Sequence, residues 1–325
     1  MDEFSFINSI KPSTYSQSSL LKGIGDDAAV FRADYRDVVT AVDTMVEDVH
    51  FSKATTEPYH IGYRCLAANI SDLAAMGATP AYYMVSLVIP DRWSEEALQH
   101  IYNGMNQLAK SYRMDLIGGD TVSGEQLMLS ITVFGYVTPG KSRMRSHARP
   151  GDVLFATGTL GDSRAGLALM LEEASISDRV AYDFFVRRHQ LPEPRVAFAE
   201  ELNGLDRLAL NDISDGIASE ANEIAEASQL SLHIDIEQLP VHPSMKQFNH
   251  YLDWVLNGGE DFELLGAVAE QDWPSVVKAA EITGVDVTKV GHVTERMKEA
   301  QVFLYEKGTR KRLDKSGYTH LKSDR

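Results

Sequence analysis

The chain is poor in cysteine and in long apolar stretches, and each shortage narrows the class of protein. Cys65 is the one cysteine among 325 residues, so no intramolecular disulfide forms, and its helical surroundings indicate a buried structural thiol. No apolar run reaches the roughly 18 residues that a membrane-spanning helix needs. The acidic start Met1-Asp2-Glu3 lacks the basic and apolar regions of a secretory signal. We therefore expect a soluble, cytoplasmic protein that has no membrane partner.

Basic residues are also scarce. Lys and Arg number 31 against 47 Asp and Glu, which gives a formal net charge of −16. Nonspecific binding to nucleic acid needs a field of positive charge, so we expect no nucleic-acid partner. The acidic excess has two interpretations: a solubilising surface, or in part a site whose charge is balanced only when Mg²⁺ and an anionic ligand bind. Composition leaves both open.

Several familiar catalytic motifs are missing. The sequence has no His-Glu-x-x-His motif and no cysteine pair, so we expect no zinc-type ligand cluster. It has no Gly-x-Ser-x-Gly motif either. We therefore expect no catalytic residue that acts as a covalent nucleophile.

An acidic, glycine-flexed turn at Gly23–Val30 places Asp26 and Asp27 side by side. A loop that binds phosphate by itself offers backbone N–H groups and a Lys or a helix N-terminus. This turn adds negative charge instead, so a phosphate beside it needs a divalent cation between them. Further aspartates stand next to glycine or at an expected strand or helix end: Asp43, Asp72, Asp120, Asp212 and Asp215. Dispersed carboxylates of this kind suit Mg²⁺, which keeps water and substrate phosphates in its coordination shell.

The order of elements predicts an α+β domain over residues 1–138, with a mostly antiparallel sheet and helices on one face. We expect strands at 28–31 and 38–42 to form a hairpin, with Asp43 at the end of the second strand. The other expected elements are helices at 56–77 and from Ser94, and strands at 84–89, 116–117 and 127–137. Asp72 and Asn69 share one face of the first helix. A carboxylate there is costly to bury unless it is paired or bound to a metal.

Residues 139–151 are rich in glycine, proline and positive charge, and they form the expected linker. This linker is either exposed to water or in contact with an anion. Residues 152–325 alternate strands and helices, as an α/β domain does.

Two turns of this second domain bear on chemistry. The strand, glycine turn and helix at 152–163 lack both the dinucleotide fingerprint and the Walker A ending, so we interpret them as a structural turn. Asp212 and Asp215 follow in a strand, and we expect them to point the same way, as a metal clamp requires.

Eight short segments then carry a resemblance. They are Gly25-Asp26-Asp27-Ala28, Val42-Asp43-Thr44, Val49-His50-Phe51, Asn69-Ile70-Ser71-Asp72-Leu73-Ala74-Ala75-Met76-Gly77, Gly118-Gly119-Asp120-Thr121, Arg149-Pro150-Gly151-Asp152, Asp212-Ile213-Ser214-Asp215-Gly216 and Gly258-Gly259-Glu260-Asp261. In this order they resemble the thiamine-monophosphate kinase family, from about residue 20 to the end. The resemblance implies the aminoimidazole ribonucleotide synthetase-like fold: an α+β N-terminal domain that pairs with a second subunit through its sheet, as a homodimer, and an α/β C-terminal domain.

The same resemblance implies an activity: transfer of the γ-phosphoryl group of ATP to thiamine monophosphate, giving thiamine diphosphate, with several Mg²⁺ ions. The implied Mg²⁺ ligands are Asp27, Asp43, Asp72, Asp120, Asp212 and Asp215. The implied ATP contacts are Gly119, Asp120, Arg145 and Ser214, and the implied contacts to the thiamine part are His50, Glu260 and Tyr318. Many relatives have Ser or Thr before the aspartate where this chain has Ala41-Val42, so only backbone carbonyl groups could bind metal there. Two roles stay open for Asp26: a turn residue, or an acid that does not contact the metal directly.

The chemistry of the acceptor agrees with the missing nucleophile. A phosphate monoester has a second pKa of about 6 and is largely ionised at pH 7, so the transfer needs no general base. We expect direct in-line transfer without a covalent intermediate. Two alternatives stay open: another ATP-dependent enzyme of the same superfamily, such as aminoimidazole ribonucleotide synthetase itself, or a noncatalytic module that binds Mg-nucleotide.

Overall fold

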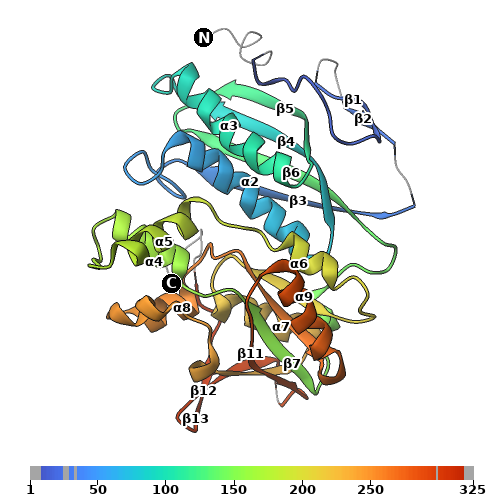
Figure 1. The fold of residues 1–325 in the computed structure, drawn as a ribbon, viewed down its shortest axis with the longest axis vertical. Coiled ribbons are helices and arrows are strands. Elements are labelled where there is room, and N and C mark those ends of the chain that lie inside the picture. Colours follow the sequence, from blue (N-terminus) through green and yellow to red (C-terminus); the bar gives the residue numbers. More distant parts are fainter. Residues whose placement is uncertain (1–8, 25–28, 33–34, 298, 318–325) are drawn as a thin grey trace. The chain divides into compact units, whose positions relative to one another are not determined.

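The structure, a computed structural model, describes residues 9–24, 29–32, 35–297 and 299–317. The chain divides into two compact units, one within residues 1–73 and 78–142 and the other within residues 74–77 and 143–325. Figure 1 shows the elements of both, and each unit is described by itself. None of the described helices has the length and hydropathy that a bilayer crossing requires.

The first unit is built on a four-stranded sheet in the order β3-β6-β4-β5. Its strands are β3 (Asp37–Val46), β4 (Thr79–Ile89), β5 (Asp115–Ser123) and β6 (Met128–Val137). Strands β4 and β5 are parallel, and the other neighbours are antiparallel. Helices α2 (Pro58–Ala75) and α3 (Glu95–Ser111) lie over one face of this sheet (Figure 1). The expected α+β fold, with a mostly antiparallel sheet and helices on one face, is confirmed.

Side-chain alternation explains which face the helices cover. Leu129, Ile131 and Val133 of β6 are fully buried, whereas the intervening Ser130 and Thr132 are half-buried. A period of two places the first three on one face of the strand. The apolar face therefore packs under the helices, and the other face carries hydroxyl groups.

Two expectations for this unit are wrong. Strand β2 (Val30–Phe31) pairs with β1 (Leu20–Lys22) rather than with β3. Strand β3 pairs with β6 over ten residues, from Asp37 to Val46, so Asp43 lies inside the strand and not at its end. The long ladder prevails because β6 offers a partner to every residue of β3, which a short local hairpin does not.

The second unit contains a seven-stranded sheet in the order β13-β12-β9-β11-β7-β10-β8. Its strands are β7 (Asp152–Thr157), β8 (Ala209–Ile213), β9 (Ser231–Asp235), β10 (Glu263–Ala269), β11 (Val287–Thr294), β12 (Gln301–Glu306) and β13 (Thr309–Leu313). Strands β12 and β9 are parallel, and the other neighbouring pairs are antiparallel.

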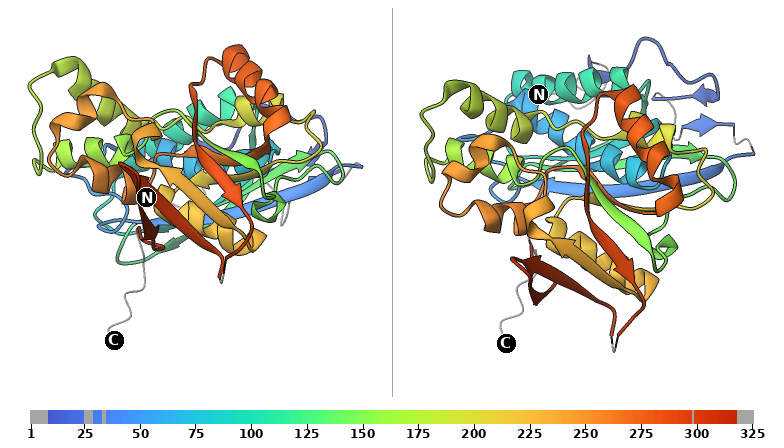
Figure 2. Two further views of the ribbon diagram at one scale, coloured as in Figure 1. Left: turned by 90° about the horizontal axis from the view of Figure 1, so that it is seen from below. Right: turned by 60° about the horizontal axis from the view of Figure 1, so that its bottom comes forward.

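Helices cover both faces of this sheet, as expected for the α/β domain. They are α4 (Asp162–Met170), α5 (Arg179–Gln190), α6 (Val196–Glu201), α7 (Ile217–Ser228), α8 (Tyr251–Asn257) and α9 (Trp273–Thr283). Short 3-10 turns occur at Arg145–His147, Ile236–Gln238, Pro243–Gln247 and Glu270–Asp272. One core joins the sheet to α4, α5, α7 and α8, and a second joins it to α6 and α9. Figure 2 shows α9 on one side of β7 and β11, with α4, α5 and α8 on the other.

Candidate active site

Two of the predicted ligands meet in the first unit. The carboxyl group of Asp43 on β3 is hydrogen-bonded to that of Asp72 on α2. The backbone N–H of Asp43 donates to Asn69 Oδ1 at 3.0 Å, and Asn69 Nδ2 donates to Cys65 O at 2.9 Å. Burial raises the pKa of Asp43, and the hydrogen bond from Asp72 only partly opposes that rise. Two carboxyl groups in contact share a proton unless a cation replaces it.

Asp120 lies on the other face of the same sheet. Cross-strand pairing aligns it with Ser86, Ser130 and Thr44 in one row. Residues directly opposite one another in a sheet point to the same face, and neighbours along a strand point to opposite faces. Because Thr44 is next to Asp43, the row of Asp120 faces away from the helices, and Asp43 faces toward them. Within this unit Asp120 therefore does not join the Asp43–Asp72 pair.

Gly119 lets β5 approach β4 closely. A Cβ atom built at Gly119 would lie 2.0 Å from the carbonyl oxygen of Val85, so no other residue fits without moving a strand. The expected strand at 116–117 is longer than predicted, because β5 continues through Gly119 and Asp120. Beyond them, the N–H of Thr121 donates to Asp120 Oδ1 at 3.0 Å.

His50 sits in a tight turn after β3. Its Nδ1 accepts the N–H of Val46 at 3.0 Å, and the N–H of Asp48 donates to Phe51 O at 2.7 Å. Asp48 adopts a left-handed conformation, with φ of 64°. Because Nδ1 is an acceptor, the imidazole proton is carried by Nε2. The turn thus leaves Nε2 as the donor nitrogen of His50.

In the second unit, Asp212 and Asp215 do not share a strand. Strand β8 ends at Ile213, so Asp212 is a buried strand residue and Asp215 belongs to the turn before α7. The expectation that both point the same way from one strand is therefore wrong. Asp215 follows Asp212 by three positions, and its N–H donates to Glu220 Oε1 at 3.2 Å.

Glu220 completes an acidic group that the sequence did not single out. Burial raises the pKa of Glu220 to about 8, and the charges of Asp212, Glu223 and Asp215 add to the rise. Its carboxyl group accepts a hydrogen bond from Asn211 Nδ2 at 2.5 Å. This acidic group therefore consists of Asp212, Asp215, Glu220 and Glu223, and their mutual repulsion disfavours ionisation of Glu220.

Arg145 is fixed beside that group. Its Nε donates to Asn211 Oδ1 at 2.8 Å, its guanidinium pairs with Glu223 at 2.5 Å, and its carbonyl oxygen accepts from Ser228 Oγ at 2.7 Å. The Arg145 side chain is half-exposed. The predicted linker thus contains a 3-10 turn, Arg145–His147, that ties an arginine to β8 and α7.

Ser214 and Glu260 meet through the backbone. The N–H of Glu260 donates to Ser214 O at 2.7 Å, and the N–H of Phe262 donates to Ile213 O at 3.0 Å. The side chain of Glu260 is 28% exposed. The turn before β10 therefore brings one implied ATP contact beside one implied thiamine contact.

Three predicted residues, Asp26, Asp27 and Tyr318, lie outside the described residues. Gly317, which precedes Tyr318, is in close contact with Asp215: a Cβ atom built there would lie 2.1 Å from the carbonyl oxygen of Asp215. The end of the described chain thus reaches the turn between β8 and α7.

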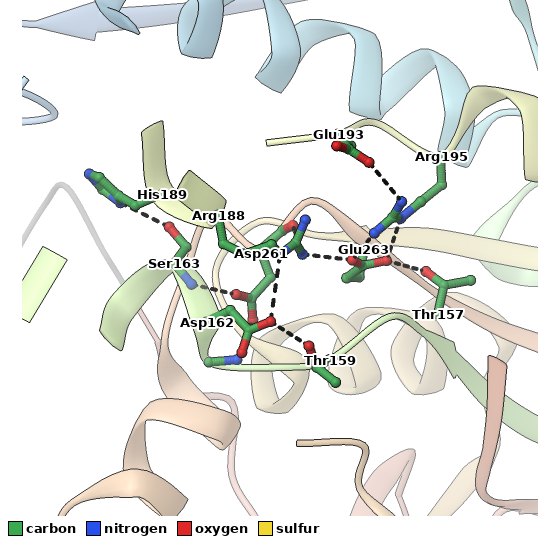
Figure 3. A network of polar contacts seen from close by, with 11 residues as sticks. Thr157, Thr159, Asp162, Ser163, Arg188, His189, Glu193, Arg195, Asp261 and Glu263 are labelled. Atoms are coloured by element: carbon green, nitrogen blue, oxygen red, sulfur yellow. Dashed lines mark hydrogen bonds and ion pairs between the residues drawn. The ribbon is translucent and has the colours of Figure 1, made fainter. Parts of the chain in front are cut away.

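A buried acid–arginine network also lies in this unit (Figure 3). Its members are Asp162, Arg188, Arg195, Asp261 and Glu263. The carboxylate of Glu263 accepts from Arg188 at 2.6 Å, from Arg195 at 2.5 and 2.7 Å, and from Thr157 Oγ1 at 2.7 Å. Arg188 Nε lies 3.5 Å from Asp162 Oδ2. This network was not predicted.

The side chain of Asp261 binds the backbone at the start of α4. Its carboxylate accepts the N–H of Gly161 at 2.6 Å and that of Ser163 at 3.0 Å. Gly161 has φ of 80°, a left-handed conformation that glycine adopts without strain. The N–H groups that would bind a phosphate are thus taken by a side chain, which supports the interpretation of this segment as a structural turn.

The charges of the network do not balance. Three carboxyl groups face two guanidinium groups, so full ionisation leaves one negative charge in excess. Burial raises the pKa of Asp162 to about 6. It raises that of Asp261 to about 8, with the Asp162 charge adding to the shift. Burial also opposes ionisation of Glu263, but Arg195 and Arg188 outweigh it and lower the pKa of Glu263. Burial and mutual repulsion thus favour the protonated form of the aspartates, while the arginines keep Glu263 ionised.

In the part of the chain that the structure describes, no three His, Cys, Asp or Glu side chains form a ready-made metal cluster. Mg²⁺ binds through one or two carboxylates and completes its shell with water and phosphate oxygens. The Asp43–Asp72 pair and the acidic group around Glu220 offer oxygen donors of this type.

Both halves of the chain match models of AIR synthase related proteins, the N-terminal domain over residues 25–137 and the C-terminal domain over residues 149–302. The fold is thus that of an AIR synthase-related protein. The thiamine-monophosphate kinase of Bacillus subtilis (strain 168) is 46% identical over 326 residues, covering 99% of this chain and 100% of the relative. The chain belongs to the thiamine-monophosphate kinase family.

Solved structures agree with that assignment. The crystal structure of thiamine-monophosphate kinase from Stenotrophomonas maltophilia K279a has a TM-score of 0.84 at 32% identity, covering 94% of this chain and 96% of the other. The structure of AaThiL complexed with AMPPCP and TMP has a TM-score of 0.78 at 28% identity, covering 98% and 97%.

Proposed function

We propose that this protein transfers the γ-phosphoryl group of ATP to thiamine monophosphate, giving thiamine diphosphate and ADP in a Mg²⁺-dependent reaction. One observation carries the proposal: the similarity to a thiamine-monophosphate kinase extends over 99% of the chain at 46% identity. A relative of the same fold binds an ATP analogue together with TMP. A cytoplasmic location stays a prediction.

Mg²⁺ ions would be held in the first unit by the Asp43–Asp72 pair and, on the other face of the sheet, by Asp120, and in the second unit by Asp212 and Asp215. The carboxyl–carboxyl hydrogen bond between Asp43 and Asp72 supports this role, because a proton there takes the place of a cation. The raised pKa of Glu220, caused by burial and then by Asp212, supports it in the second unit. Asp27, at the acidic turn, is the remaining proposed ligand.

The ATP contacts would come from a backbone surface and a fixed guanidinium group. Gly119 presents a bare backbone beside Asp120. Arg145 is oriented by Asn211 at 2.8 Å, so its charge is directed before a ligand arrives. Ser214, in the turn after β8, is held by Glu260 N–H at 2.7 Å. An arginine that is already ordered loses less entropy when it binds phosphate.

The thiamine part of the acceptor would be recognised by His50, Glu260 and Tyr318. His50 offers an Nε2–H donor because Nδ1 is used within its turn. Glu260 offers a partly exposed carboxylate, which suits the positively charged thiazolium ring or an amino group of the pyrimidine. His50 thus offers an N–H donor and Glu260 a carboxylate.

No side chain needs to form a covalent bond in this reaction. The acceptor phosphate is already an anion at neutral pH, so the obstacle is repulsion between two polyanions rather than proton removal. Bound Mg²⁺ supplies charge neutralisation and in-line alignment. Arg145 adds positive charge near the nucleotide, and the proposed contacts hold the acceptor oxygen toward the γ-phosphorus. A phosphorylated enzyme isolated after incubation with ATP alone would contradict direct transfer.

We further propose a homodimer formed through the open face of the first sheet. Val38 and Val42 of β3 are 49% and 60% exposed, although both are apolar strand residues. They point away from the helices, because they alternate with Asp43 along the strand. Exposed valines on a sheet face are side chains that a second subunit would cover.

The decisive test is incubation with ATP, Mg²⁺ and thiamine monophosphate, scored for thiamine diphosphate by chromatography. Free thiamine and aminoimidazole precursors serve as control acceptors. Product from thiamine monophosphate alone supports the proposal. Absence of thiamine diphosphate under saturating substrates overturns it, and product from an aminoimidazole precursor would favour another enzyme of the superfamily.

A further inference from the structure

The carboxylate of Glu260 reaches the surface from an unusual backbone. Glu260 and Phe262 both adopt left-handed conformations, with φ of 67° and 51°. Residues other than glycine are uncommon there, and β-sheet or helix formation does not require it. The backbone preferences of these residues do not explain the turn formed by residues 260–262, so contacts with other parts of the chain must hold it.

Asp261 is the residue that holds it. Only 2% of Asp261 is exposed. Its side chain binds two N–H groups at the start of α4, and its carbonyl oxygen accepts from Arg188 at 3.2 Å. Arg188 is itself paired with Glu263 at 2.6 Å. The residue between the two left-handed positions is thus fixed at both its side chain and its backbone.

The side chain of Glu260 has a neighbour of its own. His189, at the end of α5, is 2% exposed, and its Nδ1 lies 3.9 Å from Glu260 Oε2. The same nitrogen is 3.0 Å from Ser163 Oγ, so the imidazole is oriented by α4 (Figure 3). Asp261 and His189 therefore both connect Glu260 to α4 and α5, Asp261 through the backbone of the turn and His189 through the side chain.

We propose that Asp261 and His189 are positioning residues for Glu260: Asp261 sets the backbone of the turn, and His189 sets the direction of the carboxylate. The inference rests on the proposed function, in which Glu260 contacts the thiamine part of the acceptor. Its consequence is selective. Loss of either residue weakens binding of thiamine monophosphate and leaves binding of ATP nearly unchanged.

The experiment compares four single variants with the wild type: Glu260→Gln, Asp261→Asn, His189→Phe and the control Asp178→Asn. The control is matched to Asp261→Asn, because Asp178 also accepts two backbone N–H groups at a helix start, those of Val180 and Ala181 of α5. Asp178 precedes the first residue of α5 and lies away from the turn formed by residues 260–262. Any general loss of stability should appear in both.

Steady-state kinetics give the first readout. Because the first three variants remove either the charge of Glu260 or a residue that positions it, KM for thiamine monophosphate should rise about tenfold in each. KM for ATP should stay within about twofold, and the control should keep both values. The double variant Glu260→Gln with His189→Phe should be no worse than Glu260→Gln, because His189 acts through Glu260.

Hydrogen exchange gives a readout that does not depend on turnover. Asp261→Asn should speed amide exchange in residues 258–263, and Asp178→Asn should not. Unchanged exchange there, additive effects in the double variant, or equal rises in both KM values would overturn the inference. So would wild-type kinetics of Glu260→Gln. Failure of the wild type to form thiamine diphosphate would instead refute the proposed function, a separate outcome.

Discussion

Replacement of Asp43 by Asn removes one charge from the Asp43–Asp72 pair and keeps the size of the side chain. The backbone N–H of Asp43 still donates to Asn69 Oδ1, a 3.0 Å bond that does not involve the carboxyl group. What is lost is a charged oxygen ligand for the proposed Mg²⁺. Loss of one such electrostatic contact costs roughly 10²–10³-fold in turnover, or about 3–4 kcal/mol of transition-state free energy.

The same change should not unfold the protein. Burial raises the pKa of Asp43 in the folded state, so folding favours its protonated form. That stabilisation is complete below the ordinary aspartate pKa of about 4 and is lost as the pH rises through the raised folded value. The amide of the introduced asparagine resembles the protonated acid and has no proton to lose. Without Mg²⁺, we therefore expect the free energy of unfolding of Asp43→Asn to decline less with rising pH.

The assay joins kinetics with denaturant unfolding. At a ligand concentration of 100 Kd, ATP with Mg²⁺ should stabilise the wild type by about 2.7 kcal/mol, and a tenfold weaker variant by about 1.4 kcal/mol. Asp37→Asn is the matched control, an exposed aspartate on the same strand that accepts from Gly140 N–H at 3.0 Å. Wild-type turnover by Asp43→Asn, or loss of the fold at neutral pH, would refute the reasoning.

Three further predictions concern Glu220, Arg145 and Val38. Because the pKa of Glu220 is raised to about 8, the stability of the Mg²⁺-free protein should fall between about pH 5 and 8, by up to about 1.4 kcal/mol per pH unit. Glu220→Gln should flatten that profile, and parallel urea-unfolding curves for the two proteins would contradict this. Arg145→Lys cannot reproduce the fork that binds Asn211 and Glu223, so KM for ATP should rise about tenfold in kinetic assays. An unchanged value would remove Arg145 from the nucleotide contacts. Val38→Lys places a charge on the open sheet face, and sedimentation should then show a monomer where the wild type is a dimer. A dimeric variant would contradict the proposed interface.

The regular elements were largely predictable because their signals are local. Ser94 caps α3 as expected, since its hydroxyl accepts the N–H of Ala97 at 3.2 Å. Helix α2 and strand β6 follow their apolar periodicity. Strand β9 was not predicted, although Ser231–Asp235 alternates polar and apolar residues. Pairing between distant strands could not be predicted from local patterns, as the pairing of β3 with β6 shows.

The buried network was missed for a different reason. Asp261 and Glu263 belong to a segment that the sequence marked as acidic and glycine-rich, but their partners are far away in the chain. Arg195 and Arg188 precede Glu263 by 68 and 75 positions. No spacing rule connects residues so far apart, and an arginine near a helix end ordinarily indicates a solvated surface. Only tertiary packing brings Arg188 of α5 and Arg195, the residue before α6, to Glu263.

The amino-acid sequence alone established the family resemblance, the excess of acid and the lack of a Gly-x-Ser-x-Gly motif. These properties depend on residue identity and on order along the chain, which folding does not alter. The tertiary structure determined that Asp43 meets Asp72 while Asp120 faces the other way. It also determined that a buried arginine network supports the turn of Glu260. Distances through space and the loss of solvent set pKa values and side-chain direction, and both arise only when distant segments pack together.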